Sequence, residues 1–96
     1  MTNPKPPQQK GKRVQFRFFS PEAGSVSVAG DFNNWNEKKH PMIKTSDGYW
    51  QKTLVLKPRT YEYKFKVDNQ WQNDPDCPFN CPNAYGTKNN FILVDE

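Results

Sequence analysis

The sequence has no long hydrophobic run, and only 33% of its 96 residues are hydrophobic. No segment approaches the roughly 20 apolar residues that cross a bilayer, and the opening MTNPKPPQQKGKR lacks the apolar stretch of a secretion signal. We therefore expect no membrane partner. If Met1 is the true start of the protein, its expected location is the cytoplasm.

Cysteine and histidine are also scarce. Cys77 and Cys81 form a CxxxC pair in DPDCPFNCPNAYG, and the one histidine, His40, lies far away in the sequence. This pair is a weak zinc signal, because a zinc site needs four ligands at characteristic spacing. Reduced, packed thiols are the favoured interpretation, with a local disulfide and a metal site as the alternatives. We expect no metal and no cofactor.

Positive charge is concentrated at one end of an otherwise neutral chain. Four of the 14 Lys and Arg residues lie within residues 1–13, which hold no acid, and the other ten equal the ten Asp and Glu. Residues 1–12, rich in Pro, Gln and Lys, are expected to form a disordered basic tail. Residues 13–96 are long enough for one domain with one modest core. The neutral body argues against a nucleic-acid partner.

What the chain does have is aromatic residues, 15% of the total, and short alternating segments. A period of two predicts strands in RVQFRFF, SVSVA, YWQKTLVL and TYEYKFKV, and NNFILV closes the chain as a last strand. The alternation in TYEYKFKV sends one set of side chains inward and the other outward: Tyr61, Tyr63, Phe65 and Val67, against Glu62, Lys64 and Lys66. The predicted fold class is all-β, an antiparallel β-sandwich.

The three tryptophans differ in their surroundings. Trp50 shares a strand face with Leu54 and Leu56, so we expect it in the core. Trp35 follows the turn-forming residues GDFNN, and Trp71 lies in the polar segment VDNQWQND. Each of these two rings is either a partly buried lid over the edge of the sandwich or a surface for ligand stacking. Periodicity does not decide between the two.

A surface of this composition suits a sugar. The axial hydrogens of glucose form an apolar face that stacks on an indole, and its hydroxyl groups need partners such as Lys64 and the amides of GTKNN. One or two stacked rings and a few net hydrogen bonds predict a binding free energy of about 4 to 8 kcal/mol, which is millimolar to micromolar affinity.

Three segments carry a specific resemblance to a known family. VSVAGDFNNWN, DGYWQKTLVLKPRTYEYKFKVDNQWQNDP and YGTKNNFILV closely resemble carbohydrate-binding module family 48. That family includes the glycogen-binding domain of AMP-activated protein kinase β subunits and the N-terminal modules of glycogen branching and debranching enzymes. The resemblance implies an immunoglobulin-like, early-set β-sandwich. It also implies binding of α-1,4-linked glucan, such as glycogen, starch or a maltooligosaccharide, without catalysis.

The resemblance further implies which residues hold the carbohydrate. The stacking tryptophans of the family fall on Trp35 and Trp71 of this sequence. Its hydrogen-bonding residues fall on Lys64, Thr87 and Asn89. All five side chains are present, which favours real glucan binding over a purely structural module.

Three departures from the family pattern concern loops and turns. Tyr85 stands where the family has a leucine that reaches into the curve of the glucan, so we include it among the carbohydrate-binding residues. Asn69 replaces a usual glycine, which is tolerable because Asn adopts positive φ. Arg59 replaces a glycine that commonly precedes YEYKF, so we expect that turn to change type.

Other functions fit the sequence less well. An enzyme is disfavoured because a glycosidase needs two carboxyl groups flanking a cleft, and this small sandwich offers little room for one. The main alternative is an interaction module that docks on a glycogen-metabolising enzyme or a kinase partner without binding glucan itself. Stacking of nucleic-acid bases on the exposed rings comes third.

Overall fold

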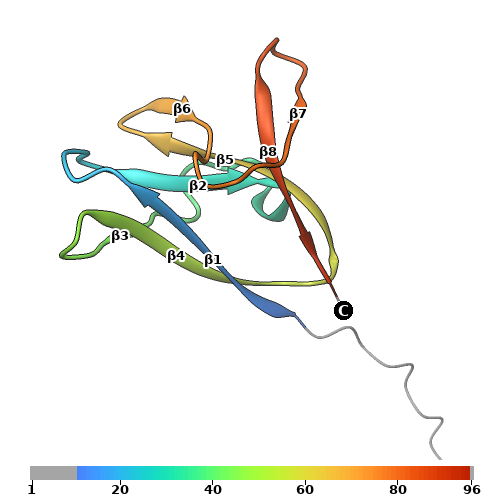
Figure 1. Ribbon diagram of the computed structural model, residues 1–96, viewed down its shortest axis with the longest axis horizontal. Coiled ribbons are helices and arrows are strands. Elements are labelled where there is room, and N and C mark those ends of the chain that lie inside the picture. Colours follow the sequence, from blue (N-terminus) through green and yellow to red (C-terminus); the bar gives the residue numbers. More distant parts are fainter. Residues whose placement is uncertain (1–10, 96) are drawn as a thin grey trace, which may run out of the picture.

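The structure, a computed structural model, describes residues 11–95. Within this range, strands build two antiparallel sheets that pack as a sandwich, which confirms the predicted fold class (Figure 1). The tail predicted over residues 1–12 lies outside the described residues except for Gly11 and Lys12. Lys12 already belongs to the first strand, where it pairs with Leu56.

The two sheets differ in size. The smaller sheet has the strand order β1 (Lys12–Phe19), β4 (Tyr49–Leu56), β3 (Ile43–Lys44). The larger sheet has the order β2 (Val26–Gly30), β5 (Arg59–Val67), β8 (Lys88–Val94), β7 (Asn80–Pro82), and a short strand β6 (Gln70–Gln72) pairs with β5. One 3-10 turn, η1 (Asp31–Asn33), follows β2 directly.

Aromatic rings fill the space between the sheets. Phe65 is fully buried, and its ring centroid lies 5.0 Å from that of Phe18 and 5.9 Å from that of Tyr63. Phe16 packs edge to face on Tyr63 at 5.0 Å. Trp50 is buried in the same core, as its alternation in β4 predicted, and its indole N–H donates to the Ser20 carbonyl. Aromatic residues are half of the twelve buried residues of this core.

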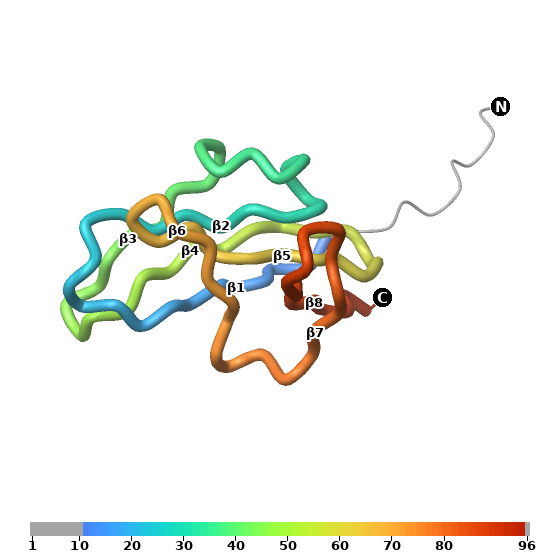
Figure 2. Tube along the Cα trace, turned by 90° about the horizontal axis from the view of Figure 1, so that it is seen from above, coloured from blue at the N-terminus to red at the C-terminus, as the bar shows by residue number. Residues whose placement is uncertain are grey.

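Strand β5 organises the larger sheet because three other strands pair with it. Both β2 and β6 pair with the segment 65–67 of β5, so they must lie on its opposite edges. Strand β8 pairs with the segment 59–63, which places β8 and β6 one after the other along the same edge. The connection from β6 to β7 forms the wide orange loop in Figure 2. This arrangement brings the segment after η1, the strand β6 and the β7–β8 hairpin together on the outer face of the sheet.

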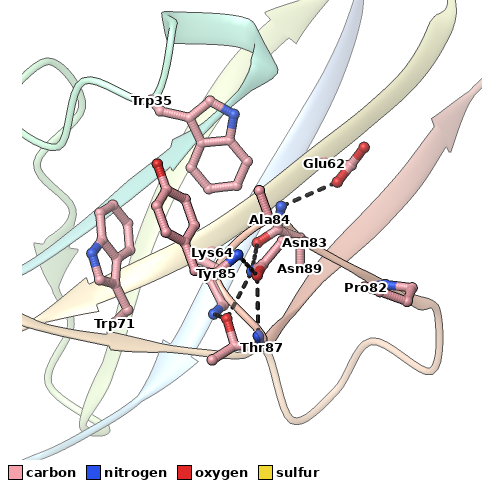
Figure 3. A pocket seen from close by; sticks show the side chains of 10 residues that line it. All are labelled: Trp35, Glu62, Lys64, Trp71, Pro82, Asn83, Ala84, Tyr85, Thr87 and Asn89. Atoms are coloured by element: carbon pink, nitrogen blue, oxygen red, sulfur yellow. Dashed lines mark hydrogen bonds between the residues drawn. The ribbon is translucent and has the colours of Figure 1, made fainter.

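Part of the outer face of β5 is covered by other segments. Lys64 alternates outward as expected, yet only 8% of its surface is exposed, and Ala29 beside it in β2 is fully buried. The β7–β8 hairpin and the segment after η1 cover this part of the sheet (Figure 3). A buried lysine needs a polar partner for its ammonium group, because an unpaired buried charge is costly.

Both cysteines are free thiols, in agreement with the packed-thiol interpretation. The Cys77 thiol packs against the core and lies 3.4 Å from the Phe91 carbonyl. The Cys81 thiol donates to Glu62 Oε1 at 3.2 Å. Partial burial and the Glu62 carboxylate raise the pKa of the Cys81 thiol, so its proton stays in place to make this bond.

Residues 11–95 contain neither a membrane-spanning helix nor a metal-binding cluster. No helix there has the length and apolar content needed to cross a membrane. No three side chains of His, Cys, Asp or Glu come together there in an arrangement that holds a metal ion.

Candidate functional site

A groove of about 950 Å³ opens on the outer face of the five-stranded sheet. It runs between the segment after η1, the strand β6 and the β7–β8 hairpin (Figure 3). The residues that line it are Trp35, Glu62, Lys64, Trp71, Pro82, Asn83, Ala84, Tyr85, Thr87 and Asn89. All six side chains singled out from the sequence are among them.

Two tryptophans form the apolar part of the groove. The ring centroids of Trp35 and Trp71 lie 6.2 Å apart, and the ring planes are inclined by 67°. Trp71 is 42% exposed, and Trp35 is half-buried. The two indoles are therefore neighbours at an angle, and they do not form one flat surface.

Trp35 is held by its own turn and by the neighbouring strand. Asn34 and Trp35 both adopt positive φ, 55° and 59°, which swings the chain back so that the Trp35 N–H donates to the Gly30 carbonyl. The indole N–H donates to Asp31 Oδ1 at 3.1 Å. The other oxygen of Asp31 accepts the backbone N–H of Glu62 at 2.8 Å. One carboxylate thus fixes the indole to β5.

Trp71 is positioned by a tight turn and by a cation. It lies on the short strand β6, within the polar segment noted in the sequence, and it pairs with Lys66 of β5. The turn before it has positive φ at Asp68 and Asn69, as expected for Asn69. The Lys66 ammonium lies 4.4 Å from the centroid of the Trp71 ring and 3.3 Å from the Glu37 carboxylate. This contact orients the indole on the outer face.

The polar side of the groove is a connected set of side chains, which we call the hairpin network: Lys64, Thr87, Asn83, Asn89 and Glu62. Lys64 Nζ donates to Thr87 Oγ1 at 3.1 Å. Asn83 Nδ2 donates to Thr87 Oγ1 at 2.7 Å and to Asn89 Oδ1 at 2.9 Å. Asn89 Nδ2 donates to Glu62 Oε1 at 3.1 Å. Lys64 therefore has the polar partner that its burial requires.

Tyr85 lies at the tip of the β7–β8 hairpin and is 91% exposed. Its backbone N–H donates to Asn83 Oδ1, and the next residue, Gly86, has a φ of 79° that only glycine adopts without strain. The hairpin thus presents an aromatic side chain that packs on little of its own domain. Such a ring is free to stack on a ligand.

Sequence reasoning missed four of the ten lining residues, and two of these, Asn83 and Glu62, belong to the hairpin network; the other two are Pro82 and Ala84. Glu62 was correctly placed on the outward face of β5 but was not singled out as part of a site. Asn83 opens the turn NAYGT, and Asn at the first position of a turn commonly accepts backbone N–H groups further along the chain. That signal was present in the sequence, but the contacts of its amide nitrogen depend on β8 and could not be read from it.

His40 supports the turn that carries Trp35. Asn33 is buried, and its Oδ1 accepts the Gly30 N–H, so its Nδ2 must face Val28 O and His40 Nδ1, 2.9 Å away. His40 Nδ1 is therefore an acceptor, and the ring is neutral. Burial, followed by the charges of Lys52 and Lys39, lowers the pKa of His40 from its ordinary value of 6.5.

This contact predicts a pH dependence of stability. Because the folded state disfavours the proton on His40, the unfolded chain binds it first, and stability falls as the pH drops below about 6.5. The fall ends once the pH is below the folded pKa. Chemical denaturation of wild type and His40→Gln at pH 7, 6 and 5 tests this, since Gln does not titrate. We expect a smaller fall in the variant, and equal falls would contradict the assignment.

The groove has little that is catalytic. Glu62 is the one carboxylic acid among the ten residues that line it. Glycosidases of both stereochemical types place two carboxyl groups about the bond that they break. Indoles, amides, a hydroxyl and an ammonium group on the face of a small β-sandwich define the class of non-catalytic carbohydrate-binding modules.

Comparison with known protein families agrees with this assignment to the carbohydrate-binding modules. The sequence profile of the family described as the glycogen recognition site of AMP-activated protein kinase matches residues 13–96. The chain belongs to this family.

Curated relatives include two 1,4-alpha-glucan branching enzymes. The chain is 42% identical over 60 residues to the 1,4-alpha-glucan branching enzyme of Oceanobacillus iheyensis, a match that covers 60% of this chain and 9% of the enzyme. It is 37% identical over 57 residues to that of Thermosynechococcus vestitus, covering 59% of this chain and 7% of the enzyme. The chain thus spans less than a tenth of the length of these relatives.

Proposed function

We propose that the groove binds an α-1,4-linked glucan, with glucose rings on Trp35 and Trp71 and hydroxyl groups on the hairpin network. The inclination of the two indoles is the observation that carries this proposal. A ligand that stacks on both rings at once must turn between successive units. An α-1,4-linked chain curves in this way, whereas a β-1,4-linked chain such as cellulose is extended and flat.

Lys64, Thr87, Asn89 and Tyr85 are the proposed polar and exposed partners of the sugar. They lie beside the indoles on the same groove, so a glucan seated on the rings has its hydroxyl groups within their reach. Each net hydrogen bond contributes about 0.5 to 1.5 kcal/mol. Together with stacking, this supports an affinity between millimolar and micromolar for short glucans.

Retention on insoluble polysaccharide tests the proposal. The protein should be retained on glycogen or amylose and pass through cellulose, because only the former present a curved chain. A rise in salt should change retention little, since the ligand carries no charge, whereas a nucleic-acid interaction would weaken steeply with salt. Equal retention on cellulose, or none on glycogen, would contradict the proposal.

Tyr85 gives a second, finer test of the site. Its exposed ring is expected to stack on the glucan and its hydroxyl to hydrogen bond, so Tyr85→Ala should weaken binding by about 1 to 2 kcal/mol. Tyr85→Leu should recover part of this loss. The recovery should be larger for β-cyclodextrin than for maltoheptaose, because a compact apolar side chain makes most contact with a cyclic glucan. Calorimetric titration measures the three proteins, and equal affinities would remove Tyr85 from the site.

We also propose that this binding brings a glycogen-metabolising partner to its polymer. The relatives that share the region are branching enzymes, and most of their length lies outside it. A non-catalytic module that binds glucan weakly can hold such an enzyme near its substrate, because a long glucan chain offers many binding sites in succession.

A further inference from the structure

The Asn83 side chain uses all of its hydrogen-bonding capacity inside the hairpin. Its Oδ1 accepts the backbone N–H of Tyr85 at 3.0 Å and that of Thr87 at 3.1 Å. Its Nδ2 donates to Thr87 Oγ1 and Asn89 Oδ1. An Asn side chain has two donor hydrogens and one carbonyl oxygen with two lone pairs, so nothing remains for a ligand. Asn83 lines the groove and yet has no free group to offer to it.

These contacts fix the direction of every hydrogen bond around Asn83. A backbone N–H can only donate, so the atom facing Tyr85 and Thr87 must be the oxygen of the Asn83 amide, and its nitrogen must face the other way. The Asn89 atom opposite that nitrogen is then the carbonyl oxygen. The Asn89 nitrogen in turn faces the Glu62 carboxylate, which can only accept while ionised.

Thr87 is constrained by the same argument. The Lys64 ammonium can only donate, and Asn83 Nδ2 can only donate, so Thr87 Oγ1 accepts from both. Both lone pairs of the hydroxyl oxygen are then occupied. The one remaining function of this hydroxyl is to donate its hydrogen, and that hydrogen points away from the two donors.

We propose that Asn83 is a positioning residue that sets the Thr87 hydroxyl as a donor toward the glucan. The inference rests on the proposed function, since it concerns the same groove. Beside Thr87, the groups that remain for the ligand are two N–H groups of Lys64 and the second N–H of Asn89. This side of the groove therefore offers hydrogen-bond donors to the oxygens of the sugar. The second oxygen of Glu62 is its complementary acceptor.

Asn83→Asp reverses this polarity with little change in shape. The Asp oxygen that replaces Oδ1 still accepts the N–H groups of Tyr85 and Thr87, so the hairpin backbone keeps its support. The other oxygen can only accept, so the bond to Asn89 Oδ1 is lost. The Thr87 hydroxyl turns to donate to this oxygen and is lost to the ligand. The new carboxylate also lies near the Lys64 ammonium, which offsets the lost amide bonds and keeps the domain folded.

The test is a double-variant cycle of Asn83→Asp and Thr87→Val, titrated with β-cyclodextrin by calorimetry. Each single variant should lose about tenfold in affinity, the value of one good hydrogen bond to the ligand. The double variant should also lose about tenfold, because both changes remove the same donor. A loss of about a hundredfold, or wild-type affinity in Asn83→Asp, would overturn the inference.

Three further measurements separate the possible failures. Thr87→Ser keeps the hydroxyl and should bind nearly as wild type. A purely steric role of Thr87 predicts the reverse, because Thr87→Val keeps the shape of the side chain and Thr87→Ser does not. If Asn83→Asp does not fold, Asn83→Ala replaces it, and Thr87→Val should then cost less in that background than in wild type; an equal loss overturns the inference. Absence of β-cyclodextrin and glycogen binding by the wild type would instead overturn the proposed function, and this inference with it.

Discussion

Replacing both groove tryptophans by alanine is expected to abolish retention on glycogen while the domain stays folded. Truncation of a Trp at the centre of a binding surface typically costs on the order of 2 kcal/mol, so loss of Trp35 and Trp71 together lowers affinity roughly a thousandfold. From a starting point between micromolar and millimolar, this leaves an affinity that is millimolar at best. Affinity electrophoresis in glycogen gels and calorimetry with maltoheptaose both measure it.

The fold should survive because neither ring belongs to the core between the sheets. Trp71 rests on Lys66 at the surface, and Trp35 covers the outer face of β5. Phe19→Ala is the matched control, since Phe19 is an exposed aromatic residue, 55% accessible, on the other sheet. It should bind glycogen as wild type. Unimpaired retention of the Trp35/Trp71 double variant would remove the indoles from the site.

The opposite behaviour is expected of Trp50→Ala, which should unfold the domain. Trp50 is 8% exposed in the middle of the three-stranded sheet, paired with Phe18 on one side and Lys44 on the other. Truncation of a buried Trp costs about 3 to 5 kcal/mol, and the indole N–H to Ser20 is lost as well. A domain of this size has about 5 to 15 kcal/mol of stability, so this loss is a large fraction of the total.

Thermal unfolding followed by circular dichroism measures this effect. For a domain of this length, 1 kcal/mol shifts the melting temperature by about 4 to 8 °C, so Trp50→Ala should melt tens of degrees below wild type. Trp50→Phe is the control that keeps an aromatic ring in the core, and it should lose much less. A melting temperature of Trp50→Ala within a few degrees of wild type would show that the core does not depend on this ring.

The sequence predicted the core well because burial on one face of a strand leaves a periodic pattern. Tyr61, Tyr63, Phe65 and Val67 are all buried, and so is Trp50. The outer face of the same strand was predicted poorly. Lys64 has the residue type of a solvated position, and its burial depends on a hairpin more than twenty residues away that the local pattern does not encode.

The candidate site was found by type of residue and by resemblance, whereas its connectivity was not found. Trp35 and Trp71 are conspicuous because indoles are rare in polar turns. Asn83 is an ordinary turn residue in the sequence. Its contacts with Thr87 and Asn89 arise only once β7 and β8 pair in register, which sets these three side chains on one side of the hairpin.

Strand β5 supplies alternate side chains to two unrelated tasks. Its odd-numbered positions from 61 to 67 are buried between the sheets, and the even-numbered positions Glu62, Lys64 and Lys66 lie under or beside the groove. Because the side-chain period of a strand is two, selection acts on two interleaved sets of codons. A substitution at an even position changes the groove and leaves the side chains between the sheets in place. A single-residue insertion or deletion within β5 exchanges the two sets, so it disrupts the core and the groove together.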